Sequence, residues 1–476
     1  MVEDVISNIT SRMKDVDLAR LFENAFPNTL DTTVRWHREA DKRVPGTTKA
    51  NKPWMGAQSF IVTGDINAEW LRDSTNQLLQ YQPLAKEDEA LRTLILGAIN
   101  TQAEYVIASP YCNAFQPPPS SNIAPSYNGQ HDIVHPGYEP SQVFECKYEL
   151  DSLAHFLALG NQFFKSTGSA EFITPRWMSA LATVIDVLKR QSHSTFNPDT
   201  GTVVNNEYTF QRHTTAGTET LSLSGLGNPL NWGTGLIRSA FRPSDDATIL
   251  GYLIPSNAMM AVELQRTADM LEKHGDQANA DYLRTGGKAL EDAVWQHGVV
   301  KHEKWGDVFA FEVDGYGSRI MMDDSNLPSL LALPLLGFVD RKHQVYQNTR
   351  KMVLSKEGNP YFLTGKTFRG IGGPHIGLRH AWPMSVLVQA MTSDDEEEIE
   401  ECLAMVLKHS HLGLVNESVN VERKGQYTRS WFAWANSVFA QAILDLAGRK
   451  PGLIFKTDEP YVIGEVKKAE QQGTEP

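Results

Sequence analysis

The chain has 476 residues, of which 41% are hydrophobic and 9% aromatic, so it can bury a large core as one big globular domain or two ordinary ones. Its 44 basic and 57 acidic residues give a formal net charge of −13, which excludes a typical nucleic-acid or membrane partner and favours a neutral substrate. No apolar run is long enough to span a membrane, and no signal peptide opens the chain. We therefore expect a cytoplasmic protein, or a secreted one if a leader was removed, whose oligomeric state the sequence leaves unknown.

The three cysteines, Cys112, Cys146 and Cys402, are an odd number, too few for a disulfide framework, and they lack the CxxC spacing of a zinc site. We expect all three to be free thiols. Neither they nor the histidines show the spacing of metal ligands, so the sequence predicts no metal and no cofactor.

Apolar residues at helical spacing recur along most of the chain. The predicted helices cover residues 74–82, 144–163, 174–190, 258–273, 276–294, 329–336, 342–354, 382–391, 394–409 and 431–447, and the clearest one covers 90–108. Between two of them, residues 109–140 are rich in proline, serine and glycine, which predicts a long loop that is functional or partly mobile. Residues 309–313 are predicted as a strand.

About a dozen helices with few strands, and with no alternation of strands and helices, indicate an all-α fold. Six helical hairpins closed into an (α/α)6 toroid would place the loops at one end around a pocket, and an irregular α-helical solenoid is the main alternative. We expect a helical N-terminal extension over 1–58 that packs on the toroid, a catalytic domain over 59–450 and a C-terminal tail over 451–476.

The segment from Thr63 to Ser74 combines Trp70 with Arg72 and Asp73 at the start of a predicted helix. A carboxylate in that place can simply cap the helix. An aromatic face beside a guanidinium and a carboxylate also matches a sugar ring, which presents C–H patches and neighbouring hydroxyls together. This segment therefore predicts a polyol site.

Asp73, the pair Asp245 and Asp246, and Glu417 lie on three loops at equal intervals along the chain. In a six-hairpin ring these loops could converge on one mouth, and two carboxyl groups are what cleavage of a glycosidic bond requires. The alternative for the Asp pair is a helix start capped by Ser244, and the alternative for Glu417 is a solvated loop. Glu149 also has a plain alternative, as part of a solvated helix face.

Six motifs in order resemble those of glycoside hydrolase family 125. They are Gly64-Asp65-Ile66-x-Ala68-x-Trp70-Leu71-Arg72-Asp73-Ser74, Lys147-Tyr148-Glu149-Leu150-Asp151-Ser152, Phe241-Arg242-Pro243-Ser244-Asp245-Asp246-Ala247, Met322-Asp323-Asp324-x-Asn326-x-Pro328-Ser329, Gly370-Ile371-Gly372-x-Pro374-His375 and Tyr427-Thr428-Arg429-x-Trp431-Phe432-Ala433-Trp434. The resemblance covers about residues 60–445. It departs from the family's pattern at Asn416, where many relatives have His, and in the proline-rich segment.

The resemblance implies an exo-acting α-1,6-mannosidase with an (α/α)6 fold that inverts the anomeric carbon without a metal. It implies that either Asp245 or Asp246 is the general acid and that Glu417 is the general base. It suggests that Arg72 and Asp73 hold the terminal mannose, with Glu149, Asp151 and His375 nearby. We add Trp70, from the predicted polyol site, and Arg429 and Trp434, which could form a pocket wall beside Glu417, as predicted substrate-binding residues. The expected partner is an α-mannoside oligosaccharide, such as an N-glycan or mannan fragment.

Two other functions fit the same residues. A glucoamylase-like α-glycosidase on the same toroid would prefer α-glucosides, and a glycan-binding toroid without catalysis would bind mannosides and release nothing.

Overall fold

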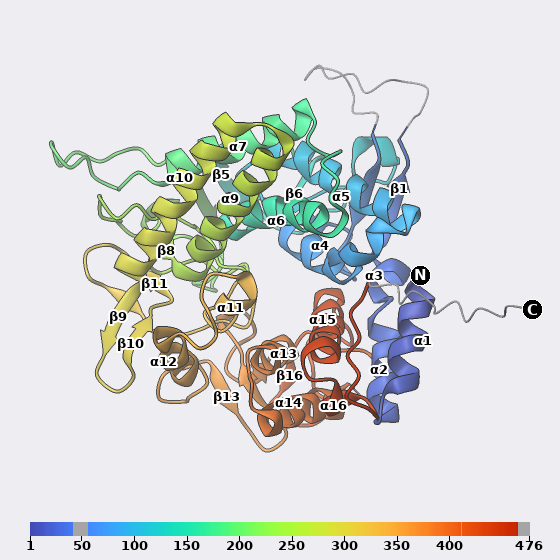
Figure 1. Ribbon diagram of the computed structural model, residues 1–476. Helices are drawn as coiled ribbons and strands as arrows, with labels where there is room; N and C mark the ends of the chain where they lie inside the picture. The colour runs from blue at the N-terminus through green and yellow to red at the C-terminus, as the bar shows by residue number, and fades with distance from the viewer. Residues whose placement is uncertain (41–55, 411, 465–476) are drawn as a thin grey trace, which may run out of the picture.

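Helices supply most of the regular structure in the computed structural model, which describes residues 1–40, 56–410 and 412–464 (Figure 1). The helix-rich fold class predicted from the sequence is confirmed. The helices are α1 (Val2–Arg12), α2 (Val16–Ala25), α3 (Asn28–Thr32), α4 (Leu71–Leu78), α5 (Glu89–Ala108), α6 (Leu150–Thr167), α7 (Pro175–Gln191), α8 (Ser222–Gly225), α9 (Ile254–His274), α10 (Gln277–Ala293), α11 (Leu333–Leu336), α12 (Gln344–Val353), α13 (Pro383–Met391), α14 (Glu396–His409), α15 (Ala433–Arg449) and α16 (Pro451–Ile454).

The strands in the described ranges are at most five residues long and pair antiparallel in small sheets. They are β1 (Val34–Arg38), β2 (Gln58–Ile61), β3 (Glu69–Trp70), β4 (Ala114–Phe115), β5 (Asp132–His135), β6 (Val143–Glu145), β7 (Thr209–Arg212), β8 (Tyr252–Leu253), β9 (Val299–His302), β10 (Gly306–Phe309), β11 (Glu312–Val313), β12 (Arg319–Ile320), β13 (Phe362–Thr364), β14 (Arg369–Ile371), β15 (His380–Ala381) and β16 (Val419–Asn420). Runs this short carry no readable alternation of polar and apolar residues, which is why most were not predicted.

The helices pack in chain order around the molecule. Helix α4 packs on α6, α6 on α9 and α9 on α11, while α13 packs on α15 and α15 returns to α4. A second set lies against the first: α5 contacts α6 and α7, α10 contacts α9, and α14 contacts α13. Figure 1 shows the result, with the blue beginning and the red end of the chain side by side.

Local signals at the helix ends explain several of these boundaries. The side chain of Asp88 accepts hydrogen bonds from two free amides of α5, and Asp395 does the same for α14. Helix α9 ends at Gly275, whose φ of 92° is left-handed and favours glycine, and Asp276 then caps α10. These caps turn α9 and α10 into a tight antiparallel hairpin.

The first and last parts of the described chain are joined. Helix α2 packs on α15 and α14, and Met13 forms a β-bridge with Phe455. Residues 41–55 of the predicted extension and 465–476 of the predicted tail lie outside the described residues. The division into extension, catalytic domain and tail stays a prediction.

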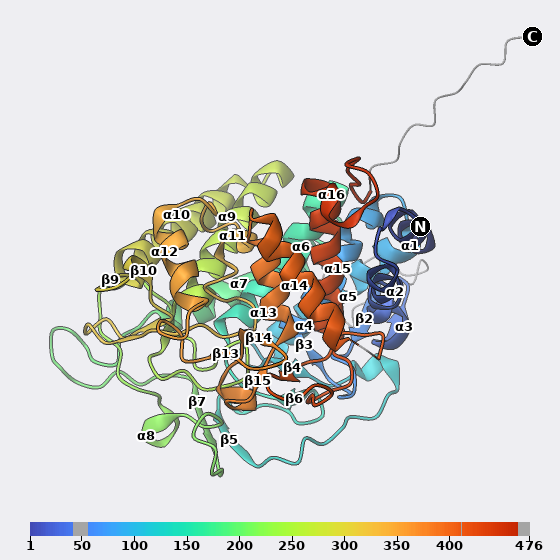
Figure 2. The same cartoon turned by 90° about the horizontal axis from the view of Figure 1, so that it is seen from below.

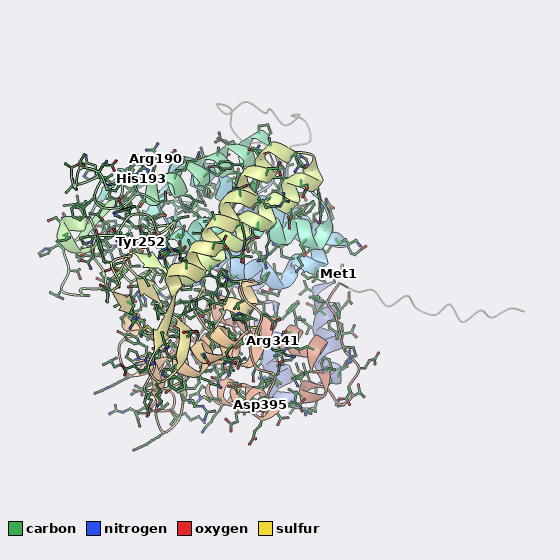
Figure 3. The ribbon with its side chains drawn as sticks, turned by 60° about the vertical axis from the view of Figure 1, so that its left-hand side comes forward. Met1, Arg190, His193, Tyr252, Arg341 and Asp395 are labelled. Carbon is green, nitrogen blue, oxygen red and sulfur yellow. A yellow bond between two sulfur atoms is a disulfide. The ribbon has the colours of Figure 1, made fainter. Side chains whose placement is uncertain are left out.

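Ion pairs also connect helices on the outer surface. Figure 3 labels Arg341, whose guanidinium pairs with Asp394 at 2.9 Å, and Asp395, the cap of α14. Both partners are partly exposed, so the pair contributes at most about 1 kcal/mol to the free energy of unfolding.

Three sequence expectations need correction. No helix begins at Asp245 and Asp246: the chain turns there, and α9 begins later, at Ile254. Helix α4 begins before Ser74 and continues as a 3-10 helix that includes Pro83, rather than stopping at that proline. The predicted strand over 309–313 is the end of β10 and the whole of β11, with a break between them.

Candidate active site

A cavity of about 420 Å³ lies where α4, α13 and α15 begin. Figure 2 shows β3, β4, β6 and β15 gathered at this end of the helices, with α16 at the opposite end. The residues that line the cavity are Thr63, Ile66, Trp70, Arg72, Asp73, Asn128, Gln130, Phe144, Glu145, Lys147, Arg212, Glu219, Pro243, Ser244, Asp245, Asn326, His375, Trp382, Glu417, Arg429, Phe432 and Trp434. Segments far apart in the sequence thus meet at one mouth.

A groove of about 740 Å³ between α2 and α14 is larger. Its ion pair, Lys14 with Glu400 at 3.9 Å, is between two exposed side chains. The smaller cavity instead holds buried carboxyl groups around a buried arginine, which is the arrangement that perturbs protonation at active sites. We therefore assign the site to the smaller cavity.

Arg72 is the centre of the cavity floor. It lies in the first turn of α4 with 4% of its side chain exposed, and four carboxyl groups surround it. Its nitrogens lie 2.6 Å from Glu149 Oε2, 3.3 Å from Asp73 Oδ2, 3.6 Å from Asp245 Oδ2 and 3.9 Å from Asp151 Oδ2. One guanidinium does not balance four buried negative charges, which favours a proton on one or more of these carboxyls.

Asp73 faces the cavity from the same helix turn. Burial is the main effect on its carboxyl and raises the pKa of Asp73 to about 6, although Arg72 opposes this. Its Oδ2 atom has no hydrogen-bond partner. This oxygen is ion-paired with Arg72 at 3.3 Å but receives no hydrogen bond, and a ligand hydroxyl in the cavity would supply one.

Asp245 lies in a turn between Phe241 and Ala247, and its φ of 68° is left-handed. This backbone conformation is uncommon for a residue other than glycine and is a frequent feature of functional sites. The carboxyl accepts hydrogen bonds from Trp70 Nε1 at 3.2 Å and from Asn113 Nδ2 at 2.9 Å. The turn therefore presents the Asp245 carboxyl to the cavity.

The pKa of Asp245 is set by competing effects. Burial raises it, but the positive charges of Arg72, Lys147 and His375 outweigh burial and lower the pKa of Asp245 to about 2. These positive charges therefore favour the carboxylate form of Asp245.

Asp246 is not among the residues that line the cavity. Its side chain is 2% exposed, accepts a hydrogen bond from the Ser244 hydroxyl at 3.0 Å, and lies 3.9 Å from His375 Nδ1. Burial would lower the pKa of His375, but Asp246 and then Asp245 raise it to about 9. Asp246 thus keeps the His375 ring charged at the cavity wall.

Glu417 also lines the cavity, from the segment between α14 and α15. Its carboxyl accepts hydrogen bonds from the Thr428 hydroxyl at 2.6 Å and from Arg429 at 2.8 Å. The neighbouring Asn416 side chain donates to the carbonyls of Arg429 and Ser430, so it ties the two arms of this loop together. The residue that departs from the family's pattern therefore supports the loop that carries Glu417.

Aromatic side chains form much of the remaining wall. Trp70 meets Phe144 edge to face at 5.6 Å, and the Trp434 ring lies 5.4 Å from the guanidinium carbon of Arg72. Trp382 and Phe432 meet edge to face at 6.0 Å. Flat apolar faces next to polar groups suit a sugar ring.

Six of the eight predicted binding residues line the cavity: Trp70, Arg72, Asp73, His375, Arg429 and Trp434. The other two, Glu149 and Asp151, lie behind Arg72 with fully buried side chains. Glu149 also proves not to be on a solvated helix face, because it precedes α6. The roles of all eight remain predictions.

Sequence reasoning missed Asn113, whose side-chain amide contacts both Glu149 and Asp245. It also missed Asn128 and Gln130, which line the cavity from the proline-rich segment. No local signal marks any of these three residues. Their position depends on the pairing of β4 with β3 and β6 and of β5 with β7.

The prediction that all cysteines are free is wrong. Cys112 and Cys146 form a disulfide with an S–S distance of 2.01 Å, and of the three cysteines only Cys402, buried in α14, is free. The sequence gives no sign of this bond because β4 and β6 are too short to be recognised as neighbours.

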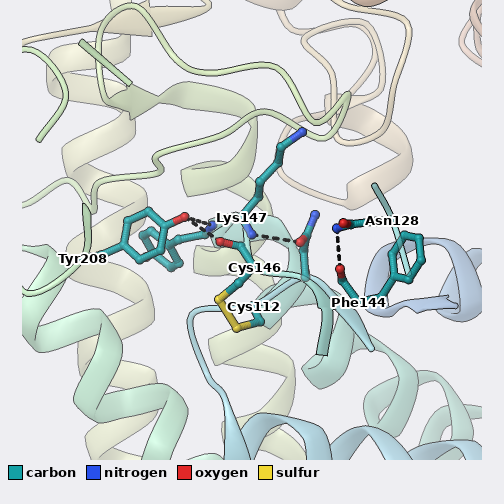
Figure 4. The surroundings of a disulfide bond; sticks show 8 residues. Cys112, Asn128, Phe144, Cys146, Lys147 and Tyr208 are labelled. Atoms are coloured by element: carbon teal, nitrogen blue, oxygen red, sulfur yellow. Dashed lines mark hydrogen bonds between the residues drawn. A yellow bond between two sulfur atoms is a disulfide. The ribbon is translucent and has the colours of Figure 1, made fainter. Parts of the chain in front are cut away.

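The disulfide lies directly behind the cavity wall. Cys112 precedes Asn113, and Cys146 precedes Lys147. The side-chain oxygen of Asn113 accepts a hydrogen bond from the Lys147 backbone N–H at 3.1 Å. Figure 4 shows these contacts, with Lys147 pointing away from the disulfide and the Tyr208 hydroxyl donating to the Cys146 carbonyl. The bond thereby holds two site residues next to each other.

In the described ranges, no group of three or more His, Cys, Asp and Glu side chains has a geometry that could hold a metal ion. None of the described helices has the length and hydropathy needed to cross a bilayer.

The sequence matches the family model of metal-independent α-mannosidases, glycoside hydrolase family 125, over residues 15–444. It is 55% identical over 460 residues to the meiotically up-regulated gene 157 protein of Schizosaccharomyces pombe, covering 96% of this chain and 87% of that protein.

The similar solved structures include two glycosidases. One is a metal-independent α-mannosidase of Streptococcus pneumoniae in a non-productive substrate complex with α-1,6-mannobiose, with 31% identity, a TM-score of 0.79, and coverage of 93% of this chain and 96% of that one. The other is a bacterial glucoamylase complexed with acarbose, with 12% identity, a TM-score of 0.50, and coverage of 82% and 51%. The second likeness concerns the fold alone.

Proposed function

The chain belongs to glycoside hydrolase family 125, the metal-independent α-mannosidases, and on that premise we propose that it is an exo-acting α-1,6-mannosidase that inverts the anomeric carbon. Its substrates would be α-mannosides with a free non-reducing end, including N-glycan or mannan fragments. The α-1,6 preference is supported by the Streptococcus pneumoniae relative, whose complex contains α-1,6-mannobiose.

The observation that carries the proposal is that Asp245 and Glu417, from loops far apart in the sequence, line one cavity with Arg72 and Asp73 on its floor. An inverting glycosidase needs an acid and a base on opposite faces of the sugar, roughly 6.5–9.5 Å apart, with room for a water beside the base. A cavity of about 420 Å³ lies within the size range of small-ligand sites.

We assign the general acid to Asp245 rather than Asp246. Asp245 lines the cavity, whereas Asp246 is buried against Ser244 and His375. In the proposed reaction, Asp245 protonates the departing glycosidic oxygen.

Glu417 is the proposed general base, and it deprotonates a water that attacks C1 from the opposite face. Thr428 and Arg429 hold its carboxyl in place. The terminal mannose would contact Trp70, Arg72, Asp73, His375 and Trp434. Glu149 and Asp151 would act on it through Arg72.

We propose that the helices form an (α/α)6 toroid. The return of α15 to α4 and the likeness of fold to the glucoamylase support this arrangement. Within it, residues 59–450 would be the catalytic domain, with 1–58 and 451–476 as its extension and tail.

The cytoplasmic location expected from the sequence stays a prediction. The Cys112–Cys146 disulfide argues for an oxidising compartment instead, because such bonds rarely persist in the cytosol. Labelling of free thiols in protein taken directly from its native cells decides between the two locations.

A glucoamylase-like activity is the main rival, and hydrolysis of α-glucosides in preference to α-mannosides would favour it. A protein that binds mannosides without releasing mannose would be a glycan-binding toroid.

The test is proton NMR of the anomeric signals while the protein digests α-1,6-mannobiose in the presence of EDTA, with Glu417→Gln as control. We expect β-mannose to appear first in the wild type and no release by the variant. Appearance of α-mannose first, or loss of activity in EDTA, would overturn the inverting, metal-independent mechanism.

A further inference from the structure

Asp245 and Glu149 form a clamped pair of carboxyl groups. The Asn113 side-chain amide donates to Glu149 Oε1 at 3.0 Å and to Asp245 Oδ1 at 2.9 Å. On the other side, Arg72 lies 2.6 Å from Glu149 and 3.6 Å from Asp245. The same two donor groups therefore hold both carboxyls next to each other.

The surroundings of the two carboxyls differ. Glu149 has no exposed side-chain surface, whereas 21% of the Asp245 side chain is exposed to the cavity. Two carboxylates in contact at one site rarely both ionise, and the more buried one holds the proton more strongly. The pair is thus expected to carry one proton, located on Glu149 while the cavity is empty.

The charged groups around the pair support this distribution. Burial is the largest effect on Glu149 and raises its pKa well above the ordinary value, while Asp245 and Asp151 add to this effect and Arg72 opposes it. Lys147 and His375 stabilise the carboxylate of Asp245. Because one Asn113 amide nitrogen donates to an oxygen of each carboxyl, the two groups lie close enough for a proton to pass between them, directly or through one water.

We propose that Glu149 stores the proton that Asp245 delivers to the glycosidic oxygen, so that the two residues act as one acid. This inference rests on the proposed function. A sugar in the cavity removes water from Asp245 and so weakens the preference of Asp245 for the charged form. The proton then moves from Glu149 to Asp245.

The proton balance of this step is complete. The Glu149 O–H bond breaks as the Asp245 O–H bond forms, and the Asp245 O–H bond breaks as the leaving sugar gains its hydroxyl hydrogen. Glu149 is left as a carboxylate paired with Arg72 and hydrogen-bonded by the Ser152 hydroxyl at 2.8 Å. After product release, the pair takes one proton from solvent, and Glu417 returns to solvent the proton that it took from water.

Glu149 acts through Asp245 and is therefore a positioning residue. Its test needs a measurement that a simple loss of structure would not change. Glu149→Gln keeps a hydrogen-bond donor but cannot transfer a proton. We compare kcat on α-1,6-mannobiose, whose leaving sugar needs protonation, with kcat on dinitrophenyl α-mannoside, whose leaving group departs as an anion. We expect a fall of about 10- to 100-fold on mannobiose and a much smaller fall on the aryl substrate.

Asp151→Asn is the matched control, because it also neutralises a buried carboxyl beside Arg72. It should lower the rates on both substrates by the same factor. Equal losses in Glu149→Gln, or no loss at all, would overturn the inference. Failure of the wild type to release mannose from mannobiose would instead overturn the proposed function.

Ser152→Ala gives a second test if Glu149→Gln does not fold. It removes a donor that stabilises the Glu149 carboxylate once the proton has left. We expect a smaller loss with the same substrate dependence, and an equal loss on both substrates would contradict the proposal. The infrared carbonyl band of a protonated carboxyl near neutral pH should also weaken when mannose is bound.

Discussion

Asp245 and Asp246 are adjacent in the chain, but their carboxyls lie in different surroundings: one lines the cavity and the other is buried beside His375. The left-handed backbone at Asp245 separates the two side chains. This relationship gives a matched pair of substitutions with different expected kinetics.

Asp245→Asn should lower kcat on α-1,6-mannobiose by about 10²- to 10⁴-fold, because it removes the proposed acid for the leaving oxygen. The loss on dinitrophenyl α-mannoside should be far smaller. Asp246→Asn should instead lower the pKa of His375 toward its ordinary value, with losses that do not depend on the leaving group. Steady-state kinetics on both substrates check this, and a leaving-group effect in Asp246→Asn alone would reverse our assignment.

Arg429→Lys should lower kcat by about tenfold or more. Arg429 lies 2.8 Å from Glu417 and 3.4 Å from Asp65, and a lysine cannot hold two carboxylates with one planar group. The matched control is Arg369→Lys, whose arginine pairs with Glu401 on the surface. Similar rates for the two variants would show that Arg429 does not position the base.

Glu69→Gln should make the protein more stable at alkaline pH. Glu69 is fully buried, and burial raises its pKa to about 8 from an ordinary value of 4.5. The folded state therefore binds a proton that the unfolded chain releases, and stability falls as pH rises from 4.5 to about 8. Melting temperatures measured across this range should fall less in the variant, and parallel curves would contradict the prediction.

Replacing both Cys112 and Cys146 by serine should destabilise the protein by about 4 kcal/mol, because the bond closes a loop between residues 34 positions apart. Activity should fall as well, since Asn113 and Lys147 follow the two cysteines. Denaturant unfolding and mannobiose kinetics are the measurements, with Cys402→Ser as control. If the folded fraction of the variant is as active as the wild type, the disulfide does not position the site.

The sequence pattern was sufficient to locate the long helices and to identify several of the site residues. Period and capping signals located α5, α7, α9, α10 and α14 to within a few residues. Trp70, Arg72, Asp73 and Glu417 were identified as candidates because unusual groups of acids, arginine and tryptophan stand out in a linear pattern. All four line the cavity.

The contacts between strands could not be predicted in this way. Asn113 and the Cys112–Cys146 bond depend on the pairing of two very short strands, and a pairing of this kind leaves no periodic pattern. The difference between Asp245 and Asp246 depends on one backbone angle, which two identical neighbouring side chains do not reveal.

The packing of α15 against α4 also has a consequence for biosynthesis. A ribosome completes Arg72, Glu149 and Asp245 well before it reaches Glu417, and Thr428 and Arg429 follow later still. A nascent or prematurely terminated chain thus contains the proposed acid without the proposed base. We therefore expect hydrolysis only after α15 has docked beside α4.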